Sequence, residues 1–181
     1  MQWRNSSERY GLVAIGLHWL VALTLFAMFA LGLWMTSLDY YHPWYHRAPA
    51  LHKSIGLTLF VVMVVRLVWR PINRAPAPLP SHTWFERLAA RLVHSLLYLL
   101  TFLVMVAGYL ISTADGRPIE VFGLLSIPAT ITSIPEQEDV AGAVHLNLAI
   151  VLIALALLHA AAALKHHFVD RDNTLRRMLG R

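Results

Sequence analysis

Residues 141–164, AGAVHLNLAIVLIALALLHAAAAL, place two histidines in a run that is otherwise almost entirely apolar. The run is long enough to cross a hydrocarbon core of about 30 Å as one α-helix. His145 and His159 are fourteen residues apart, which on a helix is roughly 21 Å along the axis and about 40° around it. We therefore predict one membrane helix that presents two imidazoles on nearly the same face, one near each membrane surface.

The composition is typical of a membrane protein. The chain has 181 residues, of which 57% are hydrophobic and only 14% charged, and its mean hydropathy is +0.56. Such values lie outside the range of soluble globular domains. Four apolar runs reach the roughly 20 residues that a membrane helix needs, and they span about 11–38, 50–69, 88–111 and 141–164. The sequence thus predicts an all-α, integral membrane four-helix bundle, with residues 1–181 forming one domain.

The distribution of Lys and Arg predicts the orientation of the bundle. Twelve of the 15 basic residues fall in the N-terminus, the second-to-third connection with its flanks, and the C-terminal tail, and three fall on the opposite side. By the positive-inside rule, both termini are expected in the cytoplasm. The pI near 10.0 then reflects topology and contact with anionic lipid rather than nucleic-acid binding.

The chain has no cysteine. Disulfides, cysteine-ligated iron–sulfur clusters, thiolate zinc sites and covalently attached haem are therefore excluded. The sequence also lacks glycine-rich phosphate loops and a nucleophile elbow, so we expect no flavin- or nicotinamide-binding domain in this polypeptide.

The connections between the spans differ in character. Residues 71–83 contain four prolines and are expected to form a semi-extended cytoplasmic connection. Residues 39–49 form an outer loop rich in tyrosine and tryptophan, where His42 and His46 are interpreted as interfacial polar residues. Residues 112–140 are expected to form a periplasmic loop that covers the bundle. The tail, residues 169–181, is expected to be a short amphipathic extension at the inner surface.

Five histidines lie within the spans, at two depths. His52 and His145 lie near the outer ends of their spans, whereas His18, His94 and His159 lie near the inner ends. The residues four positions after these histidines are small except for the one after His94, as expected where a wide planar cofactor presses against a helix; the five are Ala22, Gly56, Tyr98, Ala149 and Ala163. We therefore predict an outer pair of His52 and His145, an inner pair of His18 and His159, and a different role for His94.

Two other interpretations of the histidines fit their number and depth less well. Histidines inside a bilayer are costly, and five of them at two depths are too many for hydrogen-bonded packing residues alone. A zinc or iron channel would be expected to add intramembrane carboxylates, and zinc prefers three or four ligands that converge on one point. Opposed pairs of imidazoles instead match haem held by two histidines, which helix bundles readily accommodate.

Several stretches of the chain resemble the bacterial four-helix di-haem cytochromes b561, over nearly the whole length. They are GLHWLVA (16–22), LHKSIGL (51–57), VVMVVRLVWR (61–70), ISTADGRPIEVFG (111–123) and, most specifically, LLHAAAALKHHFVDRDNTLRRML (157–179). The resemblance implies two haem b groups per chain, each held by two histidines, and maps the iron ligands onto His18, His52, His145 and His159. His94 matches a family histidine that is not a usual axial ligand. Residues 111–123 resemble the subgroup that neighbours a periplasmic lipid-binding protein, which implies such a partner.

The resemblance also implies a function in the bacterial inner membrane. Relatives exchange electrons with ubiquinone or another quinone, and one branch oxidises superoxide at the outer face. We therefore expect a quinone-linked electron-transfer oxidoreductase with superoxide or another periplasmic donor. The alternative is a cytochrome b anchor or relay subunit of a larger membrane dehydrogenase. The sequence leaves open the donor, the direction of electron flow, the redox potentials and the oligomeric state.

Four further side chains are candidates for roles in this chemistry. Arg66 lies fourteen residues after His52, at the inner level, where it either pairs with a haem propionate or extends to the inner interface. His166 is expected to contact the quinone head group, although it could simply anchor the helix at the interface. Lys53, with Arg47, either steers a small anion such as superoxide towards the outer haem or neutralises its propionates.

Overall fold

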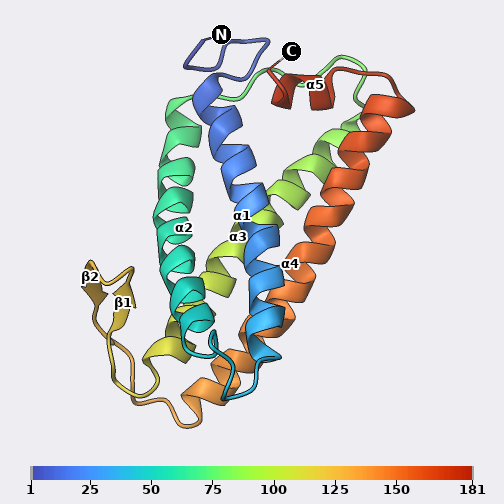
Figure 1. The fold of residues 1–181 in the computed structure, drawn as a ribbon. Helices are drawn as coiled ribbons and strands as arrows, with labels where there is room; N and C mark the ends of the chain where they lie inside the picture. Colours follow the sequence, from blue (N-terminus) through green and yellow to red (C-terminus); the bar gives the residue numbers. More distant parts are fainter. Residues whose placement is uncertain (1, 181) are drawn as a thin grey trace.

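The computed structural model describes residues 2–180 and contains four long helices. They are α1 (Leu12–Thr36), α2 (Arg47–Ile72), α3 (Trp84–Thr113) and α4 (Gln137–Phe168), as Figure 1 shows. All four are long and apolar enough to cross a membrane. The predicted all-α membrane four-helix bundle is therefore confirmed.

The helices α2, α3 and α4 continue past the apolar runs by several residues at both ends. At the start of α3, the Thr83 hydroxyl accepts a hydrogen bond from the Glu86 N–H at 3.3 Å, and the Glu86 carboxylate accepts one from the Thr83 N–H at 2.9 Å. This reciprocal arrangement is a capping box, which satisfies two free N–H groups of the first turn. An apolar run marks the part of a helix that can lie in the hydrocarbon core, whereas polar capping residues determine where the helix begins.

The bundle consists of two helix pairs. The α1 helix packs mainly on α2, and α3 packs mainly on α4, whereas the contacts of α1 with α4 and of α2 with α3 are sparser. We call the region between the two pairs the seam. At mid-depth, the seam is filled by a small core of buried Val21, Leu59 and Met63, against which Tyr98 and Phe102 of α3 pack.

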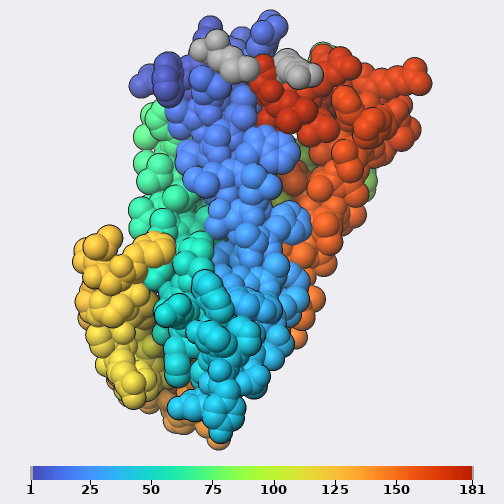
Figure 2. Space-filling model, viewed as in Figure 1, coloured from blue at the N-terminus to red at the C-terminus, as the bar shows by residue number. Residues whose placement is uncertain are grey.

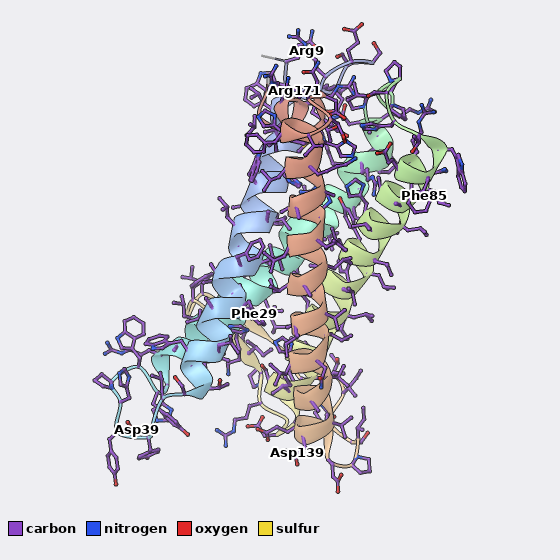
Figure 3. All side chains as sticks on the ribbon, turned by 90° about the vertical axis from the view of Figure 1, so that its right-hand side faces the viewer. Arg9, Phe29, Asp39, Phe85, Asp139 and Arg171 are labelled. Atoms are coloured by element: carbon purple, nitrogen blue, oxygen red, sulfur yellow. The ribbon has the colours of Figure 1, made fainter. Side chains whose placement is uncertain are left out.

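The two ends of the bundle differ in charge. Arg9 and Arg171 lie at one end, with the N- and C-terminal segments, and Asp39 and Asp139 lie at the other (Figure 3). At the basic end, which we call the inner end, Trp19 Nε1 donates a hydrogen bond to the Met178 carbonyl at 2.8 Å. This bond fixes the short helix α5 (Thr174–Met178) of the tail against α1.

The loop 112–140, at the outer end, contains a feature that the sequence analysis did not anticipate. Strands β1 (Ile119–Val121) and β2 (Leu125–Ile127) form an antiparallel hairpin. The Ser54 hydroxyl on α2 joins the hairpin by accepting a hydrogen bond from the Phe122 N–H at 3.0 Å. The hairpin projects beside α2, at the lower left of Figure 2.

Candidate metal centres between the helix layers

The outer end of the seam holds His52 of α2 and His145 of α4. Their ring centroids are 6.2 Å apart, with an interplanar angle of 71°. Two imidazoles on opposite sides of one metal ion, with metal–nitrogen distances of about 2.0–2.1 Å, have centroids roughly 6–6.5 Å apart. The outer pair therefore has the spacing of two ligands that share one metal.

A hydrogen bond fixes the orientation and tautomer of His145. Its Nδ1 lies 2.8 Å from the carbonyl oxygen of Val104 on α3. Because a carbonyl can only accept, Nδ1 carries the proton, and Nε2 of the neutral ring keeps a free lone pair. Metal-bound histidines are commonly held by such a second hydrogen bond, so α3 holds the His145 ring of α4 in the tautomer that a metal would require.

Two glycines on neighbouring helices make room for the outer imidazoles. A Cβ atom on Gly108 would lie 3.1 Å from His145 Cε1, and one on Gly32 would lie 3.4 Å from His52 Cε1. The sequence predicts small residues one turn after the histidines to make this room, but a Cβ on Gly56 would meet the Met28 side chain instead. Which small residue faces a ring depends on how the helices cross, and that signal was missed.

Replacing Gly108 with alanine is expected to perturb the outer centre selectively. The added Cβ pushes against the His145 ring at 3.1–3.2 Å, so the ring or α3 must move by a few tenths of an ångström. We expect a shifted redox midpoint for one of two spectroscopic components in a potentiometric titration. Gly142→Ala is the matched control on α4, because a Cβ there meets nothing within 4 Å. Equal titrations for both variants would contradict the proposed fit at Gly108.

The inner end of the seam holds three imidazoles. His159 of α4 lies 6.4 Å from His18 of α1, centroid to centroid, and only 5.1 Å from His94 of α3. The first distance suits two rings with a metal between them, whereas the second is too short for that arrangement. His94 also shares with His159 the most extensively packed pair of helices, where a planar cofactor has the least room. The geometry thus favours His18 as the partner of His159.

Arg66 of α2 lies at the inner histidine level. Its Nε donates to the Tyr98 hydroxyl at 2.8 Å, and its NH2 nitrogen lies 3.2 Å from His18 Nδ1. Because a guanidinium has no acceptor, His18 Nδ1 accepts and the ring proton lies on Nε2. A metal bound at Nε2 would move that proton to Nδ1 and free Arg66 for an anionic partner. The NH1 nitrogen of Arg66 is buried and has no hydrogen-bond partner among residues 2–180.

His166 lies near the inner end of α4, beside the tail. Its Nδ1 is 2.9 Å from a carboxylate oxygen of Asp172 and 2.9 Å from one of Asp170. Nδ1 is therefore engaged with the two carboxylates, and Nε2 makes no hydrogen bond within residues 2–180. Asp172 also binds His82 at 3.1 Å, a residue that the sequence analysis did not single out, since neither its neighbours nor its loop position suggested a role.

The charge state of Asp172 follows from its surroundings. Burial raises its pKa, but hydrogen bonds from Thr174 and His82, with the nearby His166, outweigh that effect and lower the pKa to about 2. Asp172 is therefore an anion near neutral pH. His167, the next residue, is partly buried, and its ring packs edge-to-face against Phe168 instead of joining this group.

Two cations stand near the outer end, on the first turns of α2. Lys53 directly follows His52, and Arg47 begins the helix. Neither takes part in an ion pair within the described residues, whereas Arg117 in the outer loop is paired with Asp115 at 3.2 Å. Lys53 and Arg47 thus keep their positive charge available to an anion.

Comparisons with known proteins match the whole chain. The family model described as prokaryotic cytochrome b561 matches residues 9–181. The protein named cytochrome b561 homolog 2 of Escherichia coli (strain K12) is 52% identical over 181 residues, which cover 100% of this chain and 96% of that protein. The probable superoxide oxidase CybB of Yersinia pestis is 31% identical over 173 residues, covering 95% of this chain and 96% of that protein.

Proposed function

The chain belongs to the prokaryotic cytochrome b561 family, and from this premise we propose that it holds two haems b and links an electron donor at the outer surface to quinone at the inner end. Membership itself makes the chain a multi-pass bacterial membrane protein that binds haem b and transfers electrons. The number of haems, their ligands and the quinone are the proposal.

The observation that carries the proposal is the presence of two histidine pairs at two depths of one seam. Their ring centroids are 6.2 and 6.4 Å apart, and both pairs share α4. We assign His52 and His145 to an outer iron, and His18 and His159 to an inner one. When bound, the two haems supply a one-electron relay between the membrane surfaces.

We place the basic end of the bundle in the cytoplasm. That end carries Arg9 and Arg171 (Figure 3), and twelve of the 15 basic residues of the chain belong to it by sequence. Cytoplasmic loops of membrane proteins carry an excess of Lys and Arg. Both termini and the inner histidines then lie on the cytoplasmic side, and the hairpin lies on the periplasmic side.

We assign the quinone contact to His166. It follows His159 by seven residues on α4, which is about 10 Å along the axis and about 20° off a complete two turns. Its Nδ1 is engaged by two carboxylates, which leaves Nε2 available to the quinone. Full reduction of a quinone takes two electrons and two protons, and an imidazole at the cytoplasmic boundary can pass protons to the quinone oxygens.

At the outer end, the unpaired Lys53 and Arg47 suit a small anionic donor. A relative from Yersinia pestis bears the name probable superoxide oxidase. Oxidation of two superoxide anions to dioxygen releases the two electrons that one quinone takes up. We therefore propose superoxide as a donor, attracted by the positive charge beside His52.

The proposed function is tested by rapid mixing of the purified protein. Dithionite-reduced protein is mixed with a short-chain ubiquinone, and oxidised protein is mixed with a superoxide source. We expect quinone to reoxidise both haems at a rate that rises with quinone concentration, and superoxide to reduce them. Haems that remain reduced in the presence of quinone would contradict the proposal and favour a relay subunit that delivers electrons to another protein.

Arg66 offers a separate prediction for the inner haem. We expect Arg66→Ala to lower the midpoint potential of one haem, or to weaken its retention, because the variant removes the proposed positive partner of a propionate. Arg66→Lys should recover part of the effect, since it keeps the charge. The measurement is a potentiometric titration of the α-band. Arg70→Ala is the control, because Arg70 lies on the same helix and also sits over the Tyr98 ring, at 5.4 Å. An unchanged titration of Arg66→Ala would contradict the assignment.

A further inference from the structure

The inner end of the bundle brings together three side chains from separate segments. His82 comes from the connection between α2 and α3, His166 from the last turns of α4, and Asp172 from the tail. These segments lie side by side at the end that carries α5 in Figure 1. We propose that His82, His166 and Asp172 form a binding site for a divalent transition-metal ion, which goes beyond the proposed electron-transfer function.

The donor atoms converge as metal ligands do. The Oδ2 oxygen of Asp172 lies 3.1 Å from His82 Nε2 and 2.9 Å from His166 Nδ1, and the three donor atoms all lie within 4.8 Å of one another. Ligands about 2.0–2.1 Å from one zinc ion in a tetrahedron are roughly 3.3 Å apart. A small adjustment would therefore admit an ion. The Thr174 hydroxyl, 3.1 Å from His82 Nε2, and water are available for the remaining positions.

The three side chains are sheltered from solvent, which distinguishes them from an ordinary surface cluster. Their exposed fractions are 18% for His82, 15% for His166 and 9% for Asp172. Asp172 is an anion near neutral pH, as shown above. Its carboxylate accepts a hydrogen bond from the Thr174 N–H at 2.8 Å, and no Lys or Arg forms an ion pair with it within residues 2–180.

A neighbouring set of carboxylates shows the contrast. Glu86, His166 and Asp170 also converge, but the Lys165 ammonium lies 2.7 Å from Asp170 and 3.4 Å from Glu86. That set already holds its cation. Within residues 2–180 no ammonium or guanidinium occupies the set at Asp172 in this way, so its charge is available to a bound ion.

The donor types define the class of ion. Two imidazoles and one carboxylate suit zinc and the neighbouring divalent metals, whereas magnesium and calcium prefer oxygen ligands. Each imidazole binds the ion through one nitrogen and keeps its proton on the other, so zinc competes with protonation of the rings and binds more weakly as pH falls. It also ties the proline-rich connection and the tail to α4, and bound zinc should therefore stabilise the folded chain.

The test measures zinc binding to the haem-loaded protein, which is purified with an affinity tag that contains no histidine. After equilibrium dialysis against buffered micromolar Zn²⁺, zinc per chain is measured by mass spectrometry of the metal content. We expect one zinc per chain in the unmodified protein and at least a tenfold weaker affinity in His82→Ala and Asp172→Asn. Asp172→Asn keeps the shape of the side chain, so it remains informative if His82→Ala does not fold, and the haem spectrum reports folding in each variant.

The matched controls are His167→Ala, adjacent to His166 but outside the cluster, and Glu86→Gln, in the set that Lys165 occupies. Both should bind zinc as the unmodified protein does. The inference is overturned if the unmodified protein binds no zinc, or if His82→Ala and Asp172→Asn bind it as tightly as the controls. Neither outcome depends on quinone, so the test separates this site from the proposed function.

Discussion

Replacing His145 with alanine should lower the haem content of the purified chain from two haems to one. The substitution removes the outer ligand whose Nδ1 is fixed by the Val104 carbonyl, and His52 then has no opposing imidazole at 6.2 Å. A five-coordinate haem held by one imidazole in an open seam is expected to be lost during purification. The measurement is the haem-to-protein ratio, with haem quantified from the pyridine haemochrome spectrum.

Other histidine variants serve as controls for this result. His52→Ala should give the same loss, because both rings hold one iron. His94→Ala should keep both haems, because the His94 ring is 5.1 Å from His159 and does not oppose it across an iron. Retention of two haems in the His145 variant would refute the outer pair, and loss of one haem in the His94 variant would replace His18 with His94 at the inner site.

Replacing His166 with alanine should slow reoxidation of the reduced haems by quinone by about a hundredfold, the lower end of what a positioned proton donor contributes. Haem content and reduction by an outer donor should stay unchanged, because His166 lies seven residues beyond His159. The measurement is stopped-flow absorbance at several quinone concentrations, with a chelator present to remove metal ions.

His167→Ala is the matched control for the quinone experiment. The two histidines are adjacent, but the His167 ring packs edge-to-face against Phe168, whereas His166 binds the Asp170 and Asp172 carboxylates. We expect the control to reoxidise at the unmodified rate. If both variants reoxidise at that rate, the quinone site lies elsewhere, and the loop 112–140 at the outer end becomes the next candidate.

The sequence was sufficient to predict the membrane bundle and the depth of its polar side chains. Rise per residue and apolar length are properties of a single helix, so the four spans follow from local sequence. The same arithmetic put Arg66 at the inner level, where the structure has its guanidinium 3.2 Å from His18. The pairing of histidines from different helices was predicted because each of them lies near one end of its span, at the same depth as its partner.

Features that depend on how helices cross were not predictable in this way. Gly32 and Gly108 are distant in sequence from the histidines that they accommodate. The proximity of His82 to Asp172 joins residues 90 positions apart, through loops that carry no periodic signal. The β-hairpin was missed because its two strands have three residues each, too few to show an alternating pattern.

Residue spacing alone could not decide which histidines pair at the inner end of the bundle. Counting depth gave three imidazoles at the inner level, and the small residue after His18 but not after His94 was the reason to predict His18 as the partner of His159. The distances of 6.4 Å from His159 to His18 and 5.1 Å to His94 favour the same pair. The helix pairing adds a second reason, because His18 faces His159 across the seam.

The central claim, that one seam holds two haems between opposed histidines, is tested most directly by the haem-to-protein ratio of the unmodified chain. Pyridine haemochrome absorbance, set against protein concentration from quantitative amino-acid analysis, should give two haems b per chain, with both irons low-spin and six-coordinate in the oxidised protein. A ratio of one, or a high-spin fraction equal to half of the iron, would contradict the assignment of His18, His52, His145 and His159 as two ligand pairs.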